Sequence, residues 1–286
     1  MKIALIGAKG QLGRDLATQL PQTLIPCSRE QFDLTNFSQS RNYLTAIKPD
    51  IIINCSAYNF VDQAENEPEN AFLVNTWSVK NLAQIARDLE AKFVHYSTDY
   101  VFGLYPASTP LHETDRPGPL SNYGLSKLNG EYLIQQICTD YLIIRTCGLY
   151  GLWGSGGKGG NFVETMLRVA SQGKPLRVVN DQICTPTFTE DLAKTSIQLI
   201  LAGGTGLFHI TNQNETSWHD FAKEIFHLAG LTPSLTAITS NEFGAIAKRP
   251  PYSVLSMSRL DSFGIPKPPS WQDAVARYLH ARKKRI

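Results

Sequence analysis

Short apolar runs alternate with longer amphipathic runs through the first half of this 286-residue chain. Five apolar runs have the length of strands and are too hydrophobic to face water: Ile3–Ile6, Leu24–Cys27, Ile51–Asn54, Phe93–Tyr96 and Leu142–Arg145. Helices are predicted between them at Gln11–Leu20, Asn36–Ile47, Ala71–Asp88 and Tyr123–Cys138. This alternation predicts the α/β class, with a doubly wound parallel sheet covered by helices on both faces.

The pattern changes after about Arg145. Seven glycines between Gly148 and Gly160 predict a mobile loop. It is followed by predicted helices at Phe162–Ser171, Glu190–Leu201 and Trp218–Leu228, a strand at Leu207–Thr211 and a proline-rich segment at Arg249–Pro269. We therefore expect a first domain over residues 1–147 and a smaller second domain over residues 148–286. Residues of about 181–212 are expected to return to the first domain.

Composition excludes several classes of protein. Hydrophobic residues make up 42% and charged residues 18%, which is typical of a globular protein. The net charge is +2, and four basic residues stand in the last five positions, so the body of the chain has no basic surplus for nucleic acid. No apolar run reaches the roughly 18–20 residues that span a bilayer.

The cysteines and histidines indicate a reduced, metal-free protein. The five cysteines are an odd number without CxxC spacing, which predicts reduced thiols and a cytoplasmic location. The six histidines show no HExxH or similar spacing, so no catalytic zinc is predicted. The apolar start runs directly into a glycine-rich turn, and we therefore predict no signal peptide.

That glycine-rich turn predicts a phosphate site. Gly7, Gly10 and Gly13, with Gln11 and Leu12 between the last two, follow the first strand and open the first helix. Glycine permits a tight turn and close backbone approach to a pyrophosphate, and the helix N-terminus offers unpaired N–H groups. The motif alone is weak, but its position between strand and helix predicts a dinucleotide site.

The end of the second strand bears on which dinucleotide binds. An NAD site would have an acid here for the ribose hydroxyls, whereas this chain has Ser28 and Arg29. A hydroxyl and a guanidinium suit a 2′-phosphate and favour NADPH. The alternative is that Arg29 is a surface charge and that Glu30 or Asp33 binds the ribose, which would favour NADH.

Tyr123 and Lys127 are candidate catalytic residues. They lie four positions apart at the start of a predicted helix, so they share a face, and they follow the fourth strand. An ammonium beside a phenol lowers the pKa of the phenol, which makes it a better proton donor and acceptor. Thr98 ends the fourth strand, where its hydroxyl can bind the same substrate oxygen or merely cap the strand.

These motifs resemble the extended short-chain dehydrogenases/reductases and, more narrowly, the dTDP-4-dehydrorhamnose reductases. The resemblance covers nearly the whole chain, and its later segments are the more specific ones. The matching segments are Gly7–Gly13, Asn54–Tyr58, Val61–Glu65, Ser97–Phe102, Tyr123–Lys127, Arg145–Thr146, Asn161–Val163, Val178–Gln182, Pro186–Thr187, Asp191–Ala193 and Arg249–Pro250.

The resemblance implies a Rossmann-type sheet with a C-terminal substrate domain. It implies NADPH-dependent reduction of the C4 ketone of a dTDP-linked 6-deoxy-4-keto-hexose to give dTDP-L-rhamnose. Tyr123 would protonate the C4 oxygen, Thr98 would polarise the carbonyl, and Lys127 would hold the nicotinamide ribose. The remaining implied cofactor contacts are Gln11, Leu12, Asp33, Leu34, Ala57, Tyr58, Asn59 and Tyr96.

On the substrate side, the resemblance implies that Asp99 touches the sugar and Arg249 binds the diphosphate. Related dehydratases follow the threonine with an Asp-Glu pair, but here Tyr100 follows Asp99, which favours ketone reduction over elimination. Relatives have a sugar-packing tryptophan where Gly148 stands, and Trp153 is the candidate replacement.

Some relatives hold magnesium between subunits with acidic side chains. Glu190 matches one such position, but the basic C-terminus argues against a metal here. Two other functions stay open: a reductase or epimerase acting on another nucleotide-linked 4-keto sugar, and a non-catalytic NADP-binding regulatory subunit. The sequence is silent on oligomeric state, and a homodimer is compatible with it.

Overall fold

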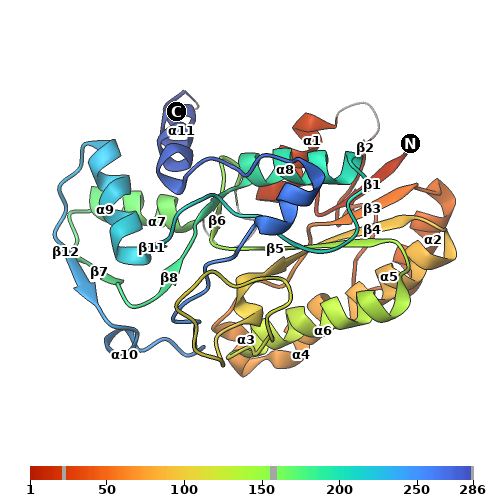
Figure 1. Cartoon of the computed structure of the whole chain (residues 1–286), viewed down its shortest axis with the longest axis horizontal. Helices are drawn as coiled ribbons and strands as arrows, with labels where there is room; N and C mark the ends of the chain where they lie inside the picture. Colours follow the sequence, from red (N-terminus) through yellow and green to blue (C-terminus); the bar gives the residue numbers. More distant parts are fainter. Residues whose placement is uncertain (21–23, 155–159, 285–286) are drawn as a thin grey trace.

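The computed structural model describes residues 1–20, 24–154 and 160–284. A six-stranded parallel sheet forms its centre, in the order β10-β5-β4-β3-β1-β2 (Figure 1). The strands are β1 (Ile3–Ile6), β2 (Leu24–Cys27), β3 (Ile51–Asn54), β4 (Lys92–Thr98), β5 (Tyr141–Thr146) and β10 (Gly206–His209). Because β1 lies between β2 and β3, the strand order reverses there. Ligands of such sheets bind at that point, outside the carboxyl ends of the strands.

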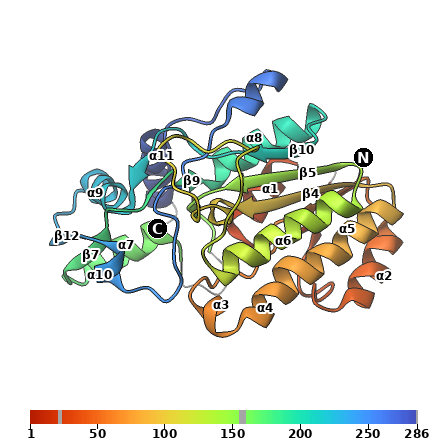
Figure 2. The same cartoon turned by 60° about the horizontal axis from the view of Figure 1, so that its bottom comes forward.

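Helices cover both faces of the sheet (Figures 1 and 2). One face carries α1 (Gln11–Gln19) and α8 (Thr189–Leu201); the other carries α2 (Phe37–Ile47), α5 (Ser78–Asp88) and α6 (Asn122–Ile137). Side chains alternate along β1, so Ile3 and Leu5 pack in the first core and Ala4 and Ile6 in the second. The predicted doubly wound parallel sheet is confirmed.

The C-terminal half, apart from α8 and β10, builds most of a second lobe at the left of Figure 1. In this lobe β7 (Leu176–Val179) pairs with β12 (Leu235–Ile238) beside α7 (Phe162–Ser171), α9 (Trp218–Ala229) and α11 (Trp271–Lys283). Its core is aromatic, with Tyr150, Phe188, Phe221, Trp271 and Tyr278 in one buried cluster. The smaller strands are β6 (Leu149–Tyr150), β8 (Ile183–Cys184), β9 (Thr187–Phe188) and β11 (Thr216–Ser217).

Several predicted elements differ in detail. The predicted helix at Ala71–Asp88 is three segments, α4 (Pro68–Phe72), a π-helix (Leu73–Trp77) and α5, after a short α3 (Gln63–Asn66). The predicted loop at 148–160 contains β6 and includes residues 155–159, which lie outside the described residues. The predicted strand at Leu207–Thr211 ends at His209. The other short elements are α10 (Ser240–Phe243) and 3-10 turns at Asp99–Val101 and Ser258–Phe263.

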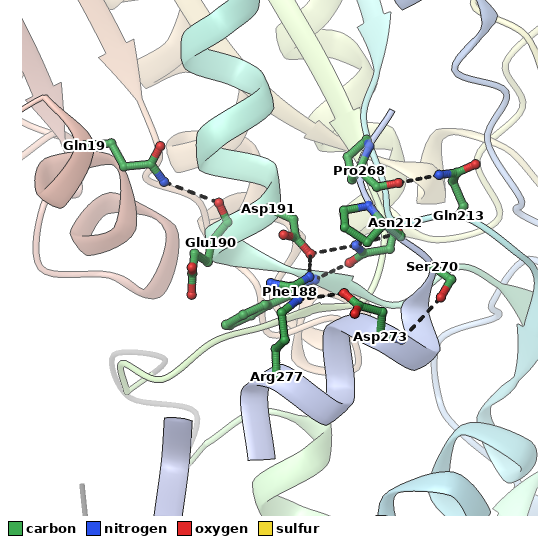
Figure 3. Close-up of polar contacts among 11 residues, drawn as sticks. Gln19, Phe188, Glu190, Asp191, Asn212, Gln213, Pro268, Ser270, Asp273 and Arg277 are labelled. Carbon is green, nitrogen blue, oxygen red and sulfur yellow. Dashed lines mark hydrogen bonds and ion pairs between the residues drawn. The ribbon is translucent and has the colours of Figure 1, made fainter. Parts of the chain in front are cut away.

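Helix α11 was not predicted from the sequence. A polar network joins it to the start of α8 (Figure 3). Asp191 accepts hydrogen bonds from Arg277 Nη2 at 2.6 Å and from Asn212 Nδ2 at 2.8 Å. Arg277 Nε also donates to Asp273 at 2.6 Å. Asp191 is only 8% exposed, so this network ties the second lobe to the sheet domain from within.

Candidate active site

The glycine turn after β1 forms a cradle that larger residues would fill. Gly7 has a φ of +80°, and its N–H donates to Cys27 O at 3.1 Å. A Cβ on Gly13 would lie 2.3 Å from Gly7 O. Gly10 caps α1 without a side-chain hydrogen bond, so the N–H groups of the first turn have no capping side chain. The turn therefore fits a bound phosphate group.

The segment after β3 packs directly against the glycine turn. Cys55 N donates to Ile6 O at 3.0 Å, and a Cβ on Gly7 would lie 2.9 Å from Ser56 Oγ. The amide of Asn75 holds the backbone of Tyr58 at both its N–H (2.9 Å) and its carbonyl (3.0 Å). Ala57, Tyr58 and Asn59 therefore line the carboxyl end of β3. No sequence motif identified Asn75, which lies in the π-helix and holds the backbone of Tyr58 from there.

The end of β2 carries a mixture of charges. Arg29 and Glu30 are exposed, and Glu30 forms an ion pair with Lys9 of the glycine turn. Ser28 Oγ donates to Gln31 Oε1 at 2.6 Å. Asp33 accepts hydrogen bonds from Thr35 N and Oγ1, which lower the pKa of Asp33. The sequence analysis did not identify Lys9 as a cation near the end of β2. Leu34 packs against the hydrophobic core on the α2 and α5 side of the sheet.

Helix α6 brings Tyr123 to the carboxyl end of β4. Ser121 caps the helix by accepting from Gly124 N at 3.1 Å. The phenol of Tyr123 lies near the Thr98 hydroxyl, and its Oη donates to Asn59 Oδ1 at 3.5 Å. Thr98 also caps the turn after β4, accepting from Tyr100 N at 3.2 Å. Thr98 therefore caps the strand end and faces the phenol as well.

One expectation about this helix is wrong. Burial raises the pKa of Tyr123, whereas Lys127 was expected to lower it. The physical reason is that Lys127 Nζ contacts other groups, donating to Tyr96 O at 2.7 Å and lying 3.2 Å from His95 Nε2. Burial lowers the pKa of Lys127 itself to about 8. The ring of Tyr96 lies in the hydrophobic core under α8. Only the main-chain carbonyl of Tyr96 contacts Lys127.

Asp99 and Arg249 lie near this group with partners of their own. Asp99 is 2% exposed and accepts hydrogen bonds from Thr98 Oγ1 at 3.1 Å and Ser253 Oγ at 2.6 Å, and burial raises the pKa of Asp99. Arg249 forms a two-bond ion pair with Asp62, at 2.7 and 3.1 Å. Arg249 was expected to bind a diphosphate. In this structure its ion pair with Asp62 joins the C-terminal segment to the segment that follows β3.

Trp153, the candidate replacement for a tryptophan at position 148, contacts helix α1. Its indole Nε1 donates to Asp15 Oδ1 at 2.8 Å, and Arg14 stacks on its ring, so it lies on α1. The aromatic ring next to Gly148 belongs to Trp218, whose Cη2 would lie 3.0 Å from a Cβ there. Sequence reasoning missed Trp218 because the contact joins residues 70 positions apart.

Glu190 is exposed at the start of α8, and its main-chain carbonyl accepts from Gln19 Nε2 at 3.4 Å (Figure 3). Within the described ranges, no three His, Cys, Asp or Glu side chains gather as a metal site.

Among the described residues, no helix is both long enough and apolar enough to cross a membrane. The five cysteines are free thiols.

The family model described as "RmlD substrate binding domain" matches residues 1–284. The chain belongs to this family. A dTDP-4-dehydrorhamnose reductase of Aggregatibacter actinomycetemcomitans is 38% identical over 96% of this chain and 97% of its own length. The spore coat polysaccharide biosynthesis protein SpsK of Bacillus subtilis is also 38% identical, over 98% of both chains. The resemblance stated from the motifs is confirmed.

Solved structures agree with this membership in the RmlD family. A dTDP-4-dehydrorhamnose reductase of Clostridium acetobutylicum superposes with a TM-score of 0.93 at 38% identity, over 99% of this chain and all of the other. The Bacillus anthracis reductase, solved with NADP, gives 0.91 at 37% identity, over 98% of this chain and all of the other. A UDP-glucose 4-epimerase of Thermus thermophilus, at 18% identity and 0.86, shares the fold.

Proposed function

We propose that this protein reduces the C4 ketone of dTDP-4-dehydro-L-rhamnose to dTDP-L-rhamnose with NADPH. The observation that carries the proposal is the position of Tyr123 near Thr98 at the carboxyl end of β4, with Lys127 buried on the same helix, α6. The family membership adds support, since the relatives named above as reductases carry this activity in their names.

In the proposed reaction NADPH supplies a hydride to the C4 carbon. The chain supplies the proton. Because burial raises the pKa of Tyr123, the phenol stays protonated at neutral pH and can donate to the developing C4 oxygen. The Thr98 hydroxyl, which donates to Asp99 Oδ1 at 3.1 Å in the free protein, would turn to donate to the same oxygen. Proton transfer of this kind typically contributes about 10²–10⁴-fold to the rate.

The cofactor would lie across the carboxyl ends of β1 and β3. The turn Gly7–Gly13 would hold the pyrophosphate through its open N–H groups, and Ala57–Asn59 would line its other side. Ser28 and Arg29, with Lys9 beside them, would bind the 2′-phosphate of NADPH. Glu30 lies in the same place, and NADH is therefore the competing cofactor in any test.

The nucleotide sugar would lie between the two domains. Residues 1–147 would mainly bind cofactor and residues 148–286 mainly substrate. Asp99 would contact the sugar, and Arg249 would reach the diphosphate while paired with Asp62. The contacts of Trp153 with α1 favour a place beside the cofactor for this side chain. The free thiols agree with a cytoplasmic enzyme, and a homodimer stays a prediction.

The decisive experiment measures NADPH and NADH consumption with the dTDP-4-keto sugar and identifies the sugar product by NMR. We expect stoichiometric loss of NADPH and formation of dTDP-L-rhamnose. Conversion of the sugar without net cofactor loss would indicate an epimerase. Cofactor binding with no turnover of any nucleotide-linked 4-keto sugar would indicate a regulatory subunit, and either result would reject the proposal.

A further inference from the structure

The buried carboxylate of Asp99 is held by two hydroxyl groups, one on each oxygen. Thr98 Oγ1 donates to Oδ1 at 3.1 Å, and Ser253 Oγ donates to Oδ2 at 2.6 Å. Asp99 and Ser253 are only 2% and 3% exposed, so bulk water does not supply donors in their place. An ionised carboxylate only accepts hydrogen bonds, and leaving a buried oxygen without a donor costs free energy. Both hydroxyl contacts therefore stabilise the charged form of Asp99.

Backbone hydrogen bonds on both sides fix the position of Ser253. Its N–H donates to Ile183 O of β8 at 2.8 Å. The carbonyl of the next residue, Val254, accepts from Leu111 N, also at 2.8 Å. Because only one rotatable bond separates the main chain from the hydroxyl oxygen, this backbone presents the Ser253 hydroxyl to Asp99 with little freedom.

Among the described residues, no cation forms an ion pair with Asp99. The titratable groups that face it are the thiol of Cys147, after β5, and the phenols of Tyr100 and Tyr123. Burial raises the pKa of both phenols, and the neighbouring Cys184 together with burial raises the pKa of the thiol, so all three are neutral near pH 7. A thiol is also a weak donor. Arg249 acts on Tyr100 but is paired with Asp62. The two hydroxyl groups are therefore the strong side-chain donors to Asp99.

The hydrogen of Thr98 cannot serve Asp99 and the substrate at once, because a hydroxyl has a single hydrogen. Thr98 Oγ1 accepts from Tyr100 N at 3.2 Å, and its hydrogen is directed at Asp99 in the free protein. When Thr98 donates to the C4 oxygen of the sugar, Asp99 Oδ1 loses that donor. The bond from Ser253 to Oδ2 remains, so the buried carboxylate is still bonded while Thr98 turns.

We propose that Ser253 is a positioning residue whose hydroxyl holds Asp99 through Oδ2, so that Thr98 can turn its hydrogen from Asp99 to the ketone of the substrate. This proposal rests on the proposed function, because it concerns the same reduction. Oδ1 is then free to accept from a hydroxyl of the sugar, which agrees with the contact expected of Asp99. Ser253 acts on the ketone only through Asp99 and Thr98.

Carbon NMR of the carboxyl groups tests the contact without reference to activity. The protein is labelled with ¹³C-aspartate, and the Asp99 signal is identified by its loss in Asp99→Asn. A donor to the charged form lowers the pKa of a carboxyl, so Ser253→Ala should raise the titration midpoint of Asp99 by about one unit or more. Ser256→Ala is the matched control on the same segment, because the Ser256 hydroxyl contacts Ser258 instead. Its midpoint should equal that of the native protein.

A double-mutant cycle in kcat tests whether Ser253 acts through Thr98. In the native background, Ser253→Ala leaves Asp99 without a hydroxyl donor when Thr98 turns, and we expect kcat to fall about 10-fold or more. In Thr98→Val no hydroxyl turns, so Asp99 has the same donors before and during the reaction. In that background Ser253→Ala should change kcat by less than about 3-fold. Ser256→Ala should leave kcat at the native value.

Equal losses from Ser253→Ala in the two backgrounds would show that Ser253 acts independently of Thr98 and would reject the proposal, as would an unmoved midpoint of Asp99. If the native protein converts no nucleotide-linked 4-keto sugar, the proposed function fails and this role fails with it. If native conversion is normal and the two losses are equal, the function stands and only the inference about Ser253 fails. Should Ser253→Ala not fold, Ser253→Cys, which keeps the size of the side chain and is a weaker donor, replaces it in both measurements.

Discussion

Replacing Glu131 by Gln should destabilise the protein far more than its conservative chemistry suggests. Glu131 is 0% exposed on α6 and accepts three hydrogen bonds from Arg145, at 3.0 and 3.2 Å from Nε and 2.6 Å from Nη2. Arg145 is 3% exposed on β5. The substitution keeps the volume of the side chain but leaves a guanidinium charge without its counter-ion beneath the sheet.

The expected cost follows from that burial. Removing one partner of a buried ion pair typically costs about 3–5 kcal/mol, because the remaining charge is poorly solvated. The amide of Gln keeps one acceptor, so we expect about 3 kcal/mol. Domains are commonly stable by only about 5–15 kcal/mol, so this loss is a large share of the total. The variant should still fold at low temperature, with a clearly lower unfolding midpoint.

Urea unfolding followed by circular dichroism measures the effect as a change in the free energy of unfolding. The control is Asp88→Asn, which removes the same charge from the Arg41–Asp88 pair, where the side chains are 40% and 39% exposed. We expect that control to cost under about 1 kcal/mol. A cost for Glu131→Gln no larger than the control's would show that Arg145 is solvated or neutralised in another way, and the reasoning from burial would be wrong.

Three further outcomes are expected. Tyr123→Phe should lower kcat by about 10²–10⁴-fold while NADPH binding, followed by fluorescence, is retained; near-normal turnover would remove the phenol from the mechanism. Arg29→Ala should raise KM for NADPH more than for NADH, and equal changes would contradict a 2′-phosphate contact. Stability should fall as pH drops below about 6.5, because burial lowers the pKa of His209 to about 3 and the unfolded chain takes up the proton first. His209→Gln should make this pH dependence of the urea midpoint shallower, and an unchanged slope would contradict it.

The sequence alone determined the sheet, and it predicted where the site lies. Strands such as Ile3–Ile6 and Ile51–Asn54 are apolar on both faces, which only a covered parallel sheet can bury. The glycine turn is equally local, because Gly7 and Gly13 meet within one turn of chain. The spacing of Tyr123 and Lys127 put both on one helix face. Each of these signals lies within a few neighbouring residues, so no tertiary contact was needed to recognise it.

Only the tertiary structure decided how the site side chains are held. The partner of Lys127 is His95, 32 positions earlier, and the partner of His95 is Asn54, 41 positions earlier still. Arg249 is paired with Asp62 across 187 positions, and Trp218 rather than Trp153 lies beside Gly148. A pKa or a tautomer depends on burial and on whichever donors and acceptors the fold brings into contact. Those neighbours come from separate strands and helices, and no pattern along the chain specifies them.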